Sequence, residues 1–391
     1  MPKGGANRKP SYPAEVGPVF SLSIHADYQC RHSGICCTSD WDVPAELAVY
    51  RSLDSAMRDD RLRVAGVAAG GGHPLILDSE LQDEAAAMVA RTAEGHCVFY
   101  HGGSGLCVVH RDLGEPALPS TCRHFPRLAV RDRRGTFISL THYCPTAAEM
   151  LFREDVPLEI VAGPAAFPAA DYDGLIVKDD AWPPLLHPRM LMDFEGYTAW
   201  ERHMVRRCAL GSLLPESILA SLERDARLLR GFVPGTCSLS DAVAGLPQEP
   251  VAAVTPSTLD RSLEFFAGVI AAVPEEFTPP ADEDGLPAVY AHTVAPAWEE
   301  WRGPLTRYLA AKAFASWTAY QGRGVLTVVR GLEAALALVR VEAARECRDS
   351  GRGLDATVMR EAFRNADFLL NHLAIGEDLA EAWSTVERAE T

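Results

Sequence analysis

YQCRHSGICC (residues 28–37) and HCVFYHGGSGLCVVH (residues 96–110) are the densest parts of a cysteine-rich segment that runs from Cys30 to Cys144. Seven of the ten cysteines lie in this segment, and eight of the twelve histidines lie in it or close to it. Thiolates are soft, anionic ligands that suit a tetrahedral zinc ion or the iron atoms of an iron–sulfur cluster. The segment therefore predicts a metal or cluster site.

Local patterns indicate how several of these cysteines come together. Two apolar runs flank GGSG at 102–105, which is typical of a β-hairpin and places Cys97 and Cys107 near each other. Cys36 and Cys37 are adjacent, with Cα atoms about 3.8 Å apart, below the range of about 4.4–6.8 Å that disulfides favour. We interpret this pair as ligands, or as one ligand and one core thiol. The alternative for the whole segment is a set of buried, unliganded thiols, since free cysteine is a common core residue.

The candidate ligands share this segment and are Cys30, Cys36, Cys37, Cys97, Cys107, Cys122, Cys144 and, three residues after Cys107, His110. Three further histidines adjoin cysteines, and a hydrogen-bonding or surface role suits each as well as ligation; they are His32, His124 and His142. The three isolated cysteines of the second half are expected to be core residues: Cys208, Cys237 and Cys347.

Charge and hydropathy narrow the class of protein. The 37 Lys and Arg against 53 Asp and Glu give a net charge of −16, which argues against a general nucleic-acid binder. A basic strip, interpreted as a solvated face or as neutralisation of thiolates, holds Arg123, Arg127, Arg131, Arg133 and Arg134. No signal peptide and no apolar run of about 18 residues is visible, so we expect no membrane span and a cytoplasmic protein. In a reducing compartment, clustered cysteines favour metal ligation over disulfides.

The chain length of 391 residues predicts two domains. We expect an α+β, mostly helical protein with a flexible arm (1–20), a metal-bound cysteine-cluster domain with short hairpins (21–150), a Pro-rich connector (151–195) and a helical domain (196–391). Strands are expected at 20–24 and 136–140, and helices near Pro44 and at 79–93. In the second half, apolar periodicity predicts helices at about 196–209, 215–231, 257–272, 296–320, 325–348, 354–373 and 376–388, the fifth of them central.

The cysteine motifs carry a family likeness. CVFY (97–100), LCVVH (106–110), TCRHFPR (121–127) and YCP (143–145) resemble the core of the YkgJ-type cysteine-cluster family, described as zinc- or iron-chelating, and YQCRHSGICC resembles its start. The wider architecture is similar to that of the longer FliB-type flagellin lysine-N-methylases. Trp41–Val43 and a later Tyr50 follow the CC pair, and FLLNHLAIGEDL (368–379) is similar to a motif in their helical half. The likeness is specific over 28–145 and loose over 196–391.

The resemblance implies that the seven cysteines bind an iron–sulfur cluster of the 4Fe-4S type, or a zinc or iron ion. Arg123 of the CR-x-FP segment would then pair with thiolate charge. Ser33 stands where the family has an additional cysteine, so either fewer ligands are used or a histidine substitutes.

The resemblance also implies a lysine N-methylase-like enzyme that acts on a protein substrate with S-adenosylmethionine. The sequence has no Gly-rich strand-to-helix loop that would bind this donor. The alternative is a non-catalytic zinc- or iron-chelating module with a helical partner-binding domain, and a redox centre is a third hypothesis.

Overall fold

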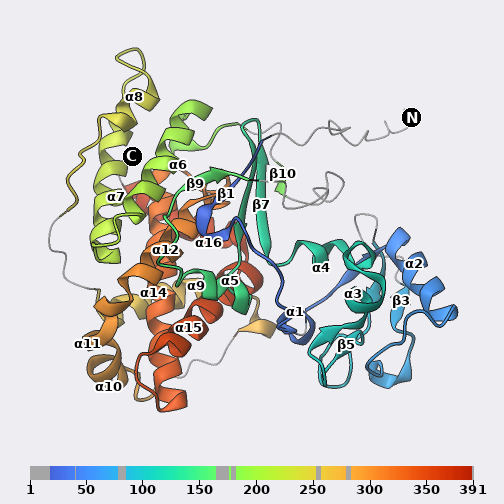
Figure 1. Ribbon diagram of the computed structural model, residues 1–391. Coiled ribbons are helices and arrows are strands. Elements are labelled where there is room, and N and C mark those ends of the chain that lie inside the picture. Colours follow the sequence, from blue (N-terminus) through green and yellow to red (C-terminus); the bar gives the residue numbers. More distant parts are fainter. Residues whose placement is uncertain are drawn as a thin grey trace, which may run out of the picture.

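The computed structural model describes residues 18–39, 41–77, 85–163, 176–177, 182–251, 257–278 and 283–389. It confirms an α+β, mostly helical fold. Two lobes lie side by side (Figure 1): a small one that carries most of the cysteine-rich segment, and a large one built from a sheet and the helical half. Most of the expected N-terminal arm (1–20) lies outside the described residues.

The small lobe is organised by a three-stranded antiparallel sheet in the order β2 (Pro44–Glu46), β4 (Ala85–Val89), β3 (Leu75–Leu77). Helix α2 (Leu47–Arg58) covers this sheet. The hairpin β5 (Tyr100–His101) and β6 (Leu106–Cys107) forms as expected, with Tyr100 opposite Cys107. Short helices α1 (Ile35–Thr38), α3 (Val108–Leu113) and α4 (Ser120–His124) complete the lobe around buried Leu53, Val98 and Phe99.

One helix expected in this lobe is a strand, and another is confirmed but begins later than expected. Within the described part of the helix predicted at 79–93, Ala85–Val89 form the strand β4, because Ala87 and Val89 are buried between two partner strands. The helix expected to start near Pro44 begins at Leu47, because Pro44–Glu46 pairs with β4. In both cases strand pairing outweighs a local helix signal.

A five-stranded mixed sheet joins segments that are far apart in the sequence. Its order is β10-β7-β8-β1-β9, with β1 (Val19–Leu22), β7 (Arg127–Asp132), β8 (Gly135–Leu140), β9 (Ile160–Ala162) and β10 (Ile176–Val177). The expected strands at 20–24 and 136–140 are confirmed as β1 and β8, which pair in parallel. Leu22, Ile24 and Phe137 share one core with the helical half, so the sheet belongs to the large lobe.

Helices form the rest of the large lobe, after a short hairpin of β11 (Leu185–His187) and β12 (Met190–Leu191). The longer ones are α6 (Phe194–Cys208), α7 (Pro215–Arg230), α9 (Leu259–Ile270), α12 (Arg302–Ala313), α14 (Val325–Ser350), α15 (Ala356–Phe368) and α16 (Gly376–Trp383). The helix expected at 296–320 is broken, because the backbone of Ala315 adopts a positive φ between α12 and the short α13 (Thr318–Gln321). The partition at residues 150 and 195 stays a prediction.

Helix α14 is the central helix that the sequence predicts, and it packs against α7, α9 and α15. Buried side chains cover most of its length, including Arg340, which is 1% exposed. The Arg340 guanidinium pairs with Glu216 of α7 and donates a hydrogen bond to the Ser262 hydroxyl of α9 at 3.0 Å. A buried charge with this many partners fixes how the three helices meet.

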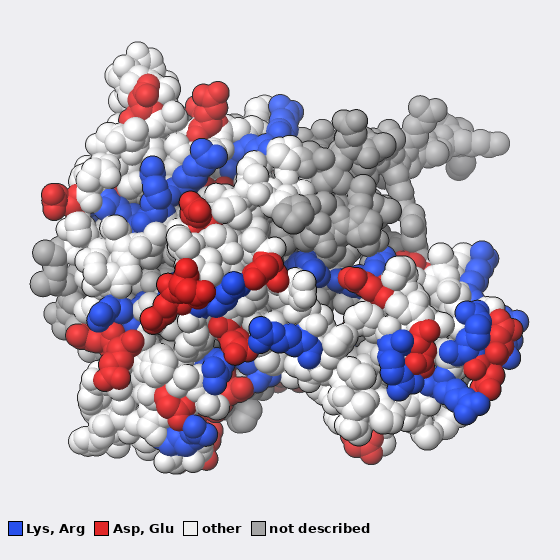
Figure 2. Space-filling view, viewed as in Figure 1, with Lys and Arg blue, Asp and Glu red and all other residues white. Residues whose placement is uncertain are grey.

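Charges of both signs are interspersed over the face in Figure 2, which carries no wide single-sign patch. One member of the expected basic strip is not solvated: Arg134 is nearly buried and pairs with Asp132 and, at 3.0 Å, with Glu201 of α6. Within the described ranges, no helix combines the length and apolarity needed to cross a membrane.

Candidate metal centre and adjoining cavity

Four thiols of the small lobe lie against one another. The Cys37 thiol interacts with the sulfurs of Cys107, Cys36 and Cys97, and the Sγ atoms of Cys36 and Cys37 are 4.0 Å apart. Cys122, on α4, is half-buried and lies within electrostatic reach of Cys36, Cys97 and Cys107. Five of the seven predicted cysteine ligands therefore belong to one packed cluster of the small lobe.

The local backbone explains how the adjacent Cys36 and Cys37 reach this cluster. Gly34, with φ of 77°, precedes α1, and a Cβ there would lie 2.7 Å from the Tyr100 ring. Glycine is required at such a position, because it has a left-handed backbone and an aromatic ring in contact. The chain then turns into α1, while the Cys97 N–H donates a hydrogen bond to the Cys37 carbonyl at 2.8 Å. Backbone contacts thus tie the CC pair to the hairpin.

The four thiols differ in the direction in which their pKa values are shifted. Hydrogen bonds to Cys107, Cys36 and Cys97 raise the pKa of Cys37 far above its ordinary value. The hydrogen bond from Cys37, aided by the backbone N–H groups of His110 and Val109, lowers the pKa of Cys107 to about 7. The pKa values of Cys36 and Cys97 are lowered by the same Cys37 thiol. The Cys37 thiol is therefore the hydrogen-bond donor of the group, and the neighbouring sulfurs are its acceptors.

A divalent metal ion suits this donor set, because thiolates are soft anionic ligands whose charge the ion would neutralise. Four sulfurs about 2.3 Å from a tetrahedral zinc ion would be about 3.8 Å apart, close to the 4.0 Å between Cys36 and Cys37. Among the described residues, no three His, Cys, Asp or Glu side chains already converge as a ligand set. The sulfurs would therefore have to turn toward a shared ion for a metal to bind.

Cys30 and Cys144 lie apart from this group, near Tyr28. The Tyr28 hydroxyl and the Cys144 Sγ are 3.5 Å apart, and the Arg127 guanidinium stacks 5.2 Å from the centroid of the Tyr28 ring. Partial desolvation raises the pKa of Cys30, which is exposed and lies within electrostatic reach of both Cys36 and Cys144. The structure thus places these two cysteines beside the five-thiol group.

The two other predicted site residues, His110 and Arg123, mainly contact groups other than the thiols. The His110 ring lies against the His32 ring, with centroids 4.9 Å apart, and its backbone N–H donates to Cys107. The Arg123 guanidinium donates a hydrogen bond to the Leu118 carbonyl at 2.6 Å. These contacts support the loops around the thiols.

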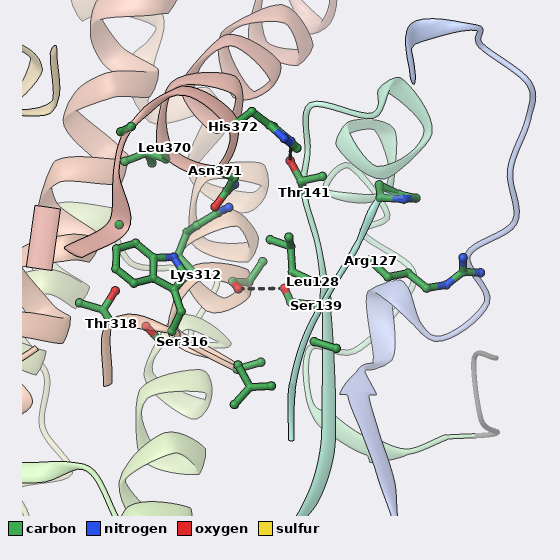
Figure 3. A pocket seen from close by; sticks show the side chains of 18 of the residues that line it. Arg127, Leu128, Ser139, Thr141, Lys312, Ser316, Thr318, Leu370, Asn371 and His372 are labelled. Atoms are coloured by element: carbon green, nitrogen blue, oxygen red, sulfur yellow. Dashed lines mark hydrogen bonds between the residues drawn. The ribbon is translucent and has the colours of Figure 1, made fainter. Parts of the chain in front are cut away.

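A large cavity, with a volume of about 670 Å³, opens between the two lobes next to the thiols. Cys36 and Cys122 lie in its wall on the side of the small lobe. In Figure 3, Leu128, Ser139 and Thr141 of the strand side face Lys312, Asn371 and His372 of the helical side, and Arg127 points away from them. Its size lies within the range of small-molecule sites, about 300–1,000 Å³.

His372 and Asn371 belong to a π-helical turn, η8 (Leu369–Leu373), that continues α15. Such turns occur often at functional sites. The His372 Nε2 is 3.1 Å from the Thr141 hydroxyl, and its ring lies 5.1 Å from the Trp41 ring. Burial lowers the pKa of His372 to about 4, so its imidazole is neutral near pH 7.

A buried network of polar side chains holds Lys312 at the cavity wall. Asp367 accepts hydrogen bonds from the His142 ring at 3.0 Å and from the Tyr308 hydroxyl at 2.7 Å, and it pairs with Lys312 Nζ at 2.6 Å. His142 Nε2 is 3.3 Å from His25 Nε2. Burial alone would raise the pKa of Asp367, but Lys312 and His142 outweigh it and hold this pKa well below its usual range. The carboxylate is therefore ionised and Lys312 is anchored at the cavity wall.

We expect the stability of the protein to fall as the pH drops below about 6.5. The unfolded chain protonates His372 near pH 6.5 and the folded chain only near pH 4, so the unfolded state binds more protons in that window. This group alone contributes a slope of about 1.4 kcal/mol per pH unit there, and none above it. Urea unfolding of the wild type and His372→Gln between pH 4.5 and 8 measures it. Parallel pH profiles of the two proteins would contradict the expectation.

The pattern of cysteines did not reveal the polar groups on the helical side of the cavity. Asn371 and His372 interrupt the apolar run FLLNHL, and Lys312 interrupts AAKAFA, which were the available signals. A scan of protein-family models and searches of curated proteins and of solved structures found no match to this chain.

Proposed function

We propose that this protein binds a metal ion or an iron–sulfur cluster through the thiols of its small lobe. The observation that carries the proposal is the packing of Cys36, Cys37, Cys97 and Cys107 around the Cys37 thiol, with Cys122 in the same cluster. Cys30 and Cys144 are the nearest further ligands. We also propose a reducing, cytoplasmic setting, in keeping with ten free cysteines.

The contact between the sulfurs supports a single tetrahedral ion, zinc or iron, more directly than a cluster. Thiols that share one ion lie about 3.8 Å apart, whereas thiols on a 4Fe-4S cluster bind separate iron atoms and lie further apart. The 4.0 Å separation of Cys36 and Cys37 agrees with the first arrangement. The cluster is the second candidate, because five thiols exceed what one ion needs.

The position of the centre supports an enzyme. Cys36 and Cys122 line a cavity large enough for a small molecule, so a bound metal would lie next to a ligand. A metal ion held by three of the thiolates would keep one coordination position open and would supply a Lewis acid there, while Lys312 and His372 would orient the ligand. A lysine N-methylase-like activity on a protein substrate is the enzymatic candidate, and it comes from the sequence resemblance.

S-adenosylmethionine has less support as the methyl donor, because the cavity wall offers little negative charge to this cationic molecule. Among the described residues of the wall, Asp42 is the one carboxylate, and it is exposed. The alternative is a chelating module whose helical lobe binds a partner. In that case, removal of the metal by chelators would not affect any catalytic turnover.

Metal and acid-labile sulfide analysis of protein purified without oxygen tests the proposal. We expect about one zinc or iron ion per chain without sulfide, because one tetrahedral ion satisfies four sulfurs. Iron with sulfide and a broad visible absorption band would establish the cluster instead. Folded protein with no metal and with all seven thiols titratable would refute both forms of the proposal.

A further inference from the structure

Lys312 presents an ammonium group with unused donors at the cavity wall. Its Nζ atom carries three N–H donors, one of which is directed at Asp367 Oδ1 at 2.6 Å. Asp367 is fully buried and also accepts from Tyr308 and His142, so its oxygens have little capacity left. The side chain of Lys312 is 14% exposed and lines the cavity. Its remaining donors are therefore available to an acceptor in the cavity.

Asn371 supplies a second donor to the same cavity. Its Nδ2 atom is buried and has no hydrogen-bond partner within the described part of the chain, although the residue lines the cavity. Buried amide donors without partners are rare in native proteins, because each forfeits its hydration without a replacement. A ligand atom that accepts hydrogen bonds would satisfy this group.

The remainder of the wall is largely apolar. Leu128, Val130, Phe314, Trp317, Leu332 and Trp383 contribute to it. A ligand that fills the cavity must therefore present apolar surface to these side chains and an acceptor group to Lys312 and Asn371.

We propose that the cavity binds a small molecule with an anionic carboxylate head and an apolar body, the head at Lys312 and Asn371. A carboxylate offers two acceptor oxygens to these donors, and the interaction with an ammonium group is charge-assisted. A cationic head would instead face the Lys312 charge, while the Asp367 carboxylate behind it is already occupied. The proposal does not depend on a metal at the thiols.

Calorimetric titration of the full chain with decanoate, decanol and decylamine, each below its aggregation concentration, tests the ligand class. The three probes share one apolar chain and differ in head group. We expect decanoate to bind at least about tenfold more tightly than decanol, and decylamine to bind most weakly. Equal affinity for decanoate and decanol would overturn the proposal. Tighter binding of decylamine, which mimics a lysine side chain, would overturn it in favour of a cationic substrate.

Asn371→Leu locates the head group. The variant removes a donor that has no partner in the protein, so it should fold at least as well as the wild type, with an unchanged or higher Tm. We expect its affinity for decanoate to fall about three- to tenfold, with the affinity for decanol unchanged. Asn365→Leu is the matched control, because Asn365 lies outside the cavity wall and donates to Glu346. Equal decanoate affinity in wild type and Asn371→Leu, or an equal loss in both variants, would overturn the assignment.

Discussion

Cys37→Ala is expected to abolish tight metal binding and to loosen the small lobe. Cys37 is the thiol that contacts Cys107, Cys36 and Cys97, so its loss removes the centre of the ligand group. Changes that only support a ligand cost about 10- to 100-fold in metal affinity, and removal of a ligand should exceed that. Metal content after dialysis and hydrogen exchange over residues 35–124 measure the two effects.

The expected loss of protection follows from the coupling of metal binding to folding. Structural zinc contributes about 10–16 kcal/mol of apparent binding free energy in small domains, and the small lobe has a core of its own that is much smaller than that of the large lobe. The large lobe should keep its exchange protection. Cys237→Ser is the control, because Cys237 is exposed, contrary to the core position expected from the sequence, and it lies outside the cysteine-rich segment. Wild-type metal content in Cys37→Ala would contradict ligation by this thiol.

Asp367→Asn is expected to destabilise the folded protein by about 3–5 kcal/mol, because it leaves the Lys312 ammonium without its counter-charge in a buried site. Asp367 is fully buried and connects α15 to Lys312 of α12 and to His142, next to β8. The substitution keeps the size of the side chain and removes its charge. Urea unfolding at pH 7 measures the difference in free energy of unfolding.

Glu223→Gln is the matched control for this charge change. Glu223 pairs with Arg227 on the surface of α7, where both side chains are more than a third exposed. Exposed pairs of this kind contribute about 0.3–0.5 kcal/mol. Similar losses in the two variants would show that the buried pair does not stabilise the large lobe.

Local signals were enough for part of this molecule. The hairpin at Cys97 and Cys107 was predictable because a glycine-rich turn between two apolar runs specifies pairing over a few residues. The central position of α14 was predictable because apolar residues on several of its faces can be buried only from several sides. The cysteine spacing likewise pointed to a thiol site before any contact was known.

Other features depend on long-range pairing that no short window contains. The Ala-rich segment at Ala85–Val89 is a strand because β2 and β3 flank it. Arg134 is nearly buried because Asp132 and Glu201 accept its charge. These outcomes follow from partners whose distance and direction the sequence alone does not specify.

The sequence by itself determined that a thiol-rich segment precedes a helical half, because composition and periodicity are local properties. Only the tertiary structure decided that Cys122 joins the hairpin thiols, that Cys30 and Cys144 lie beside them, and that a cavity opens next to the group. His142 and Asp367 show the reason, because they are 225 residues apart in the chain and their side chains are hydrogen-bonded to each other in the core. A contact of that kind exists only once the strands and helices have packed.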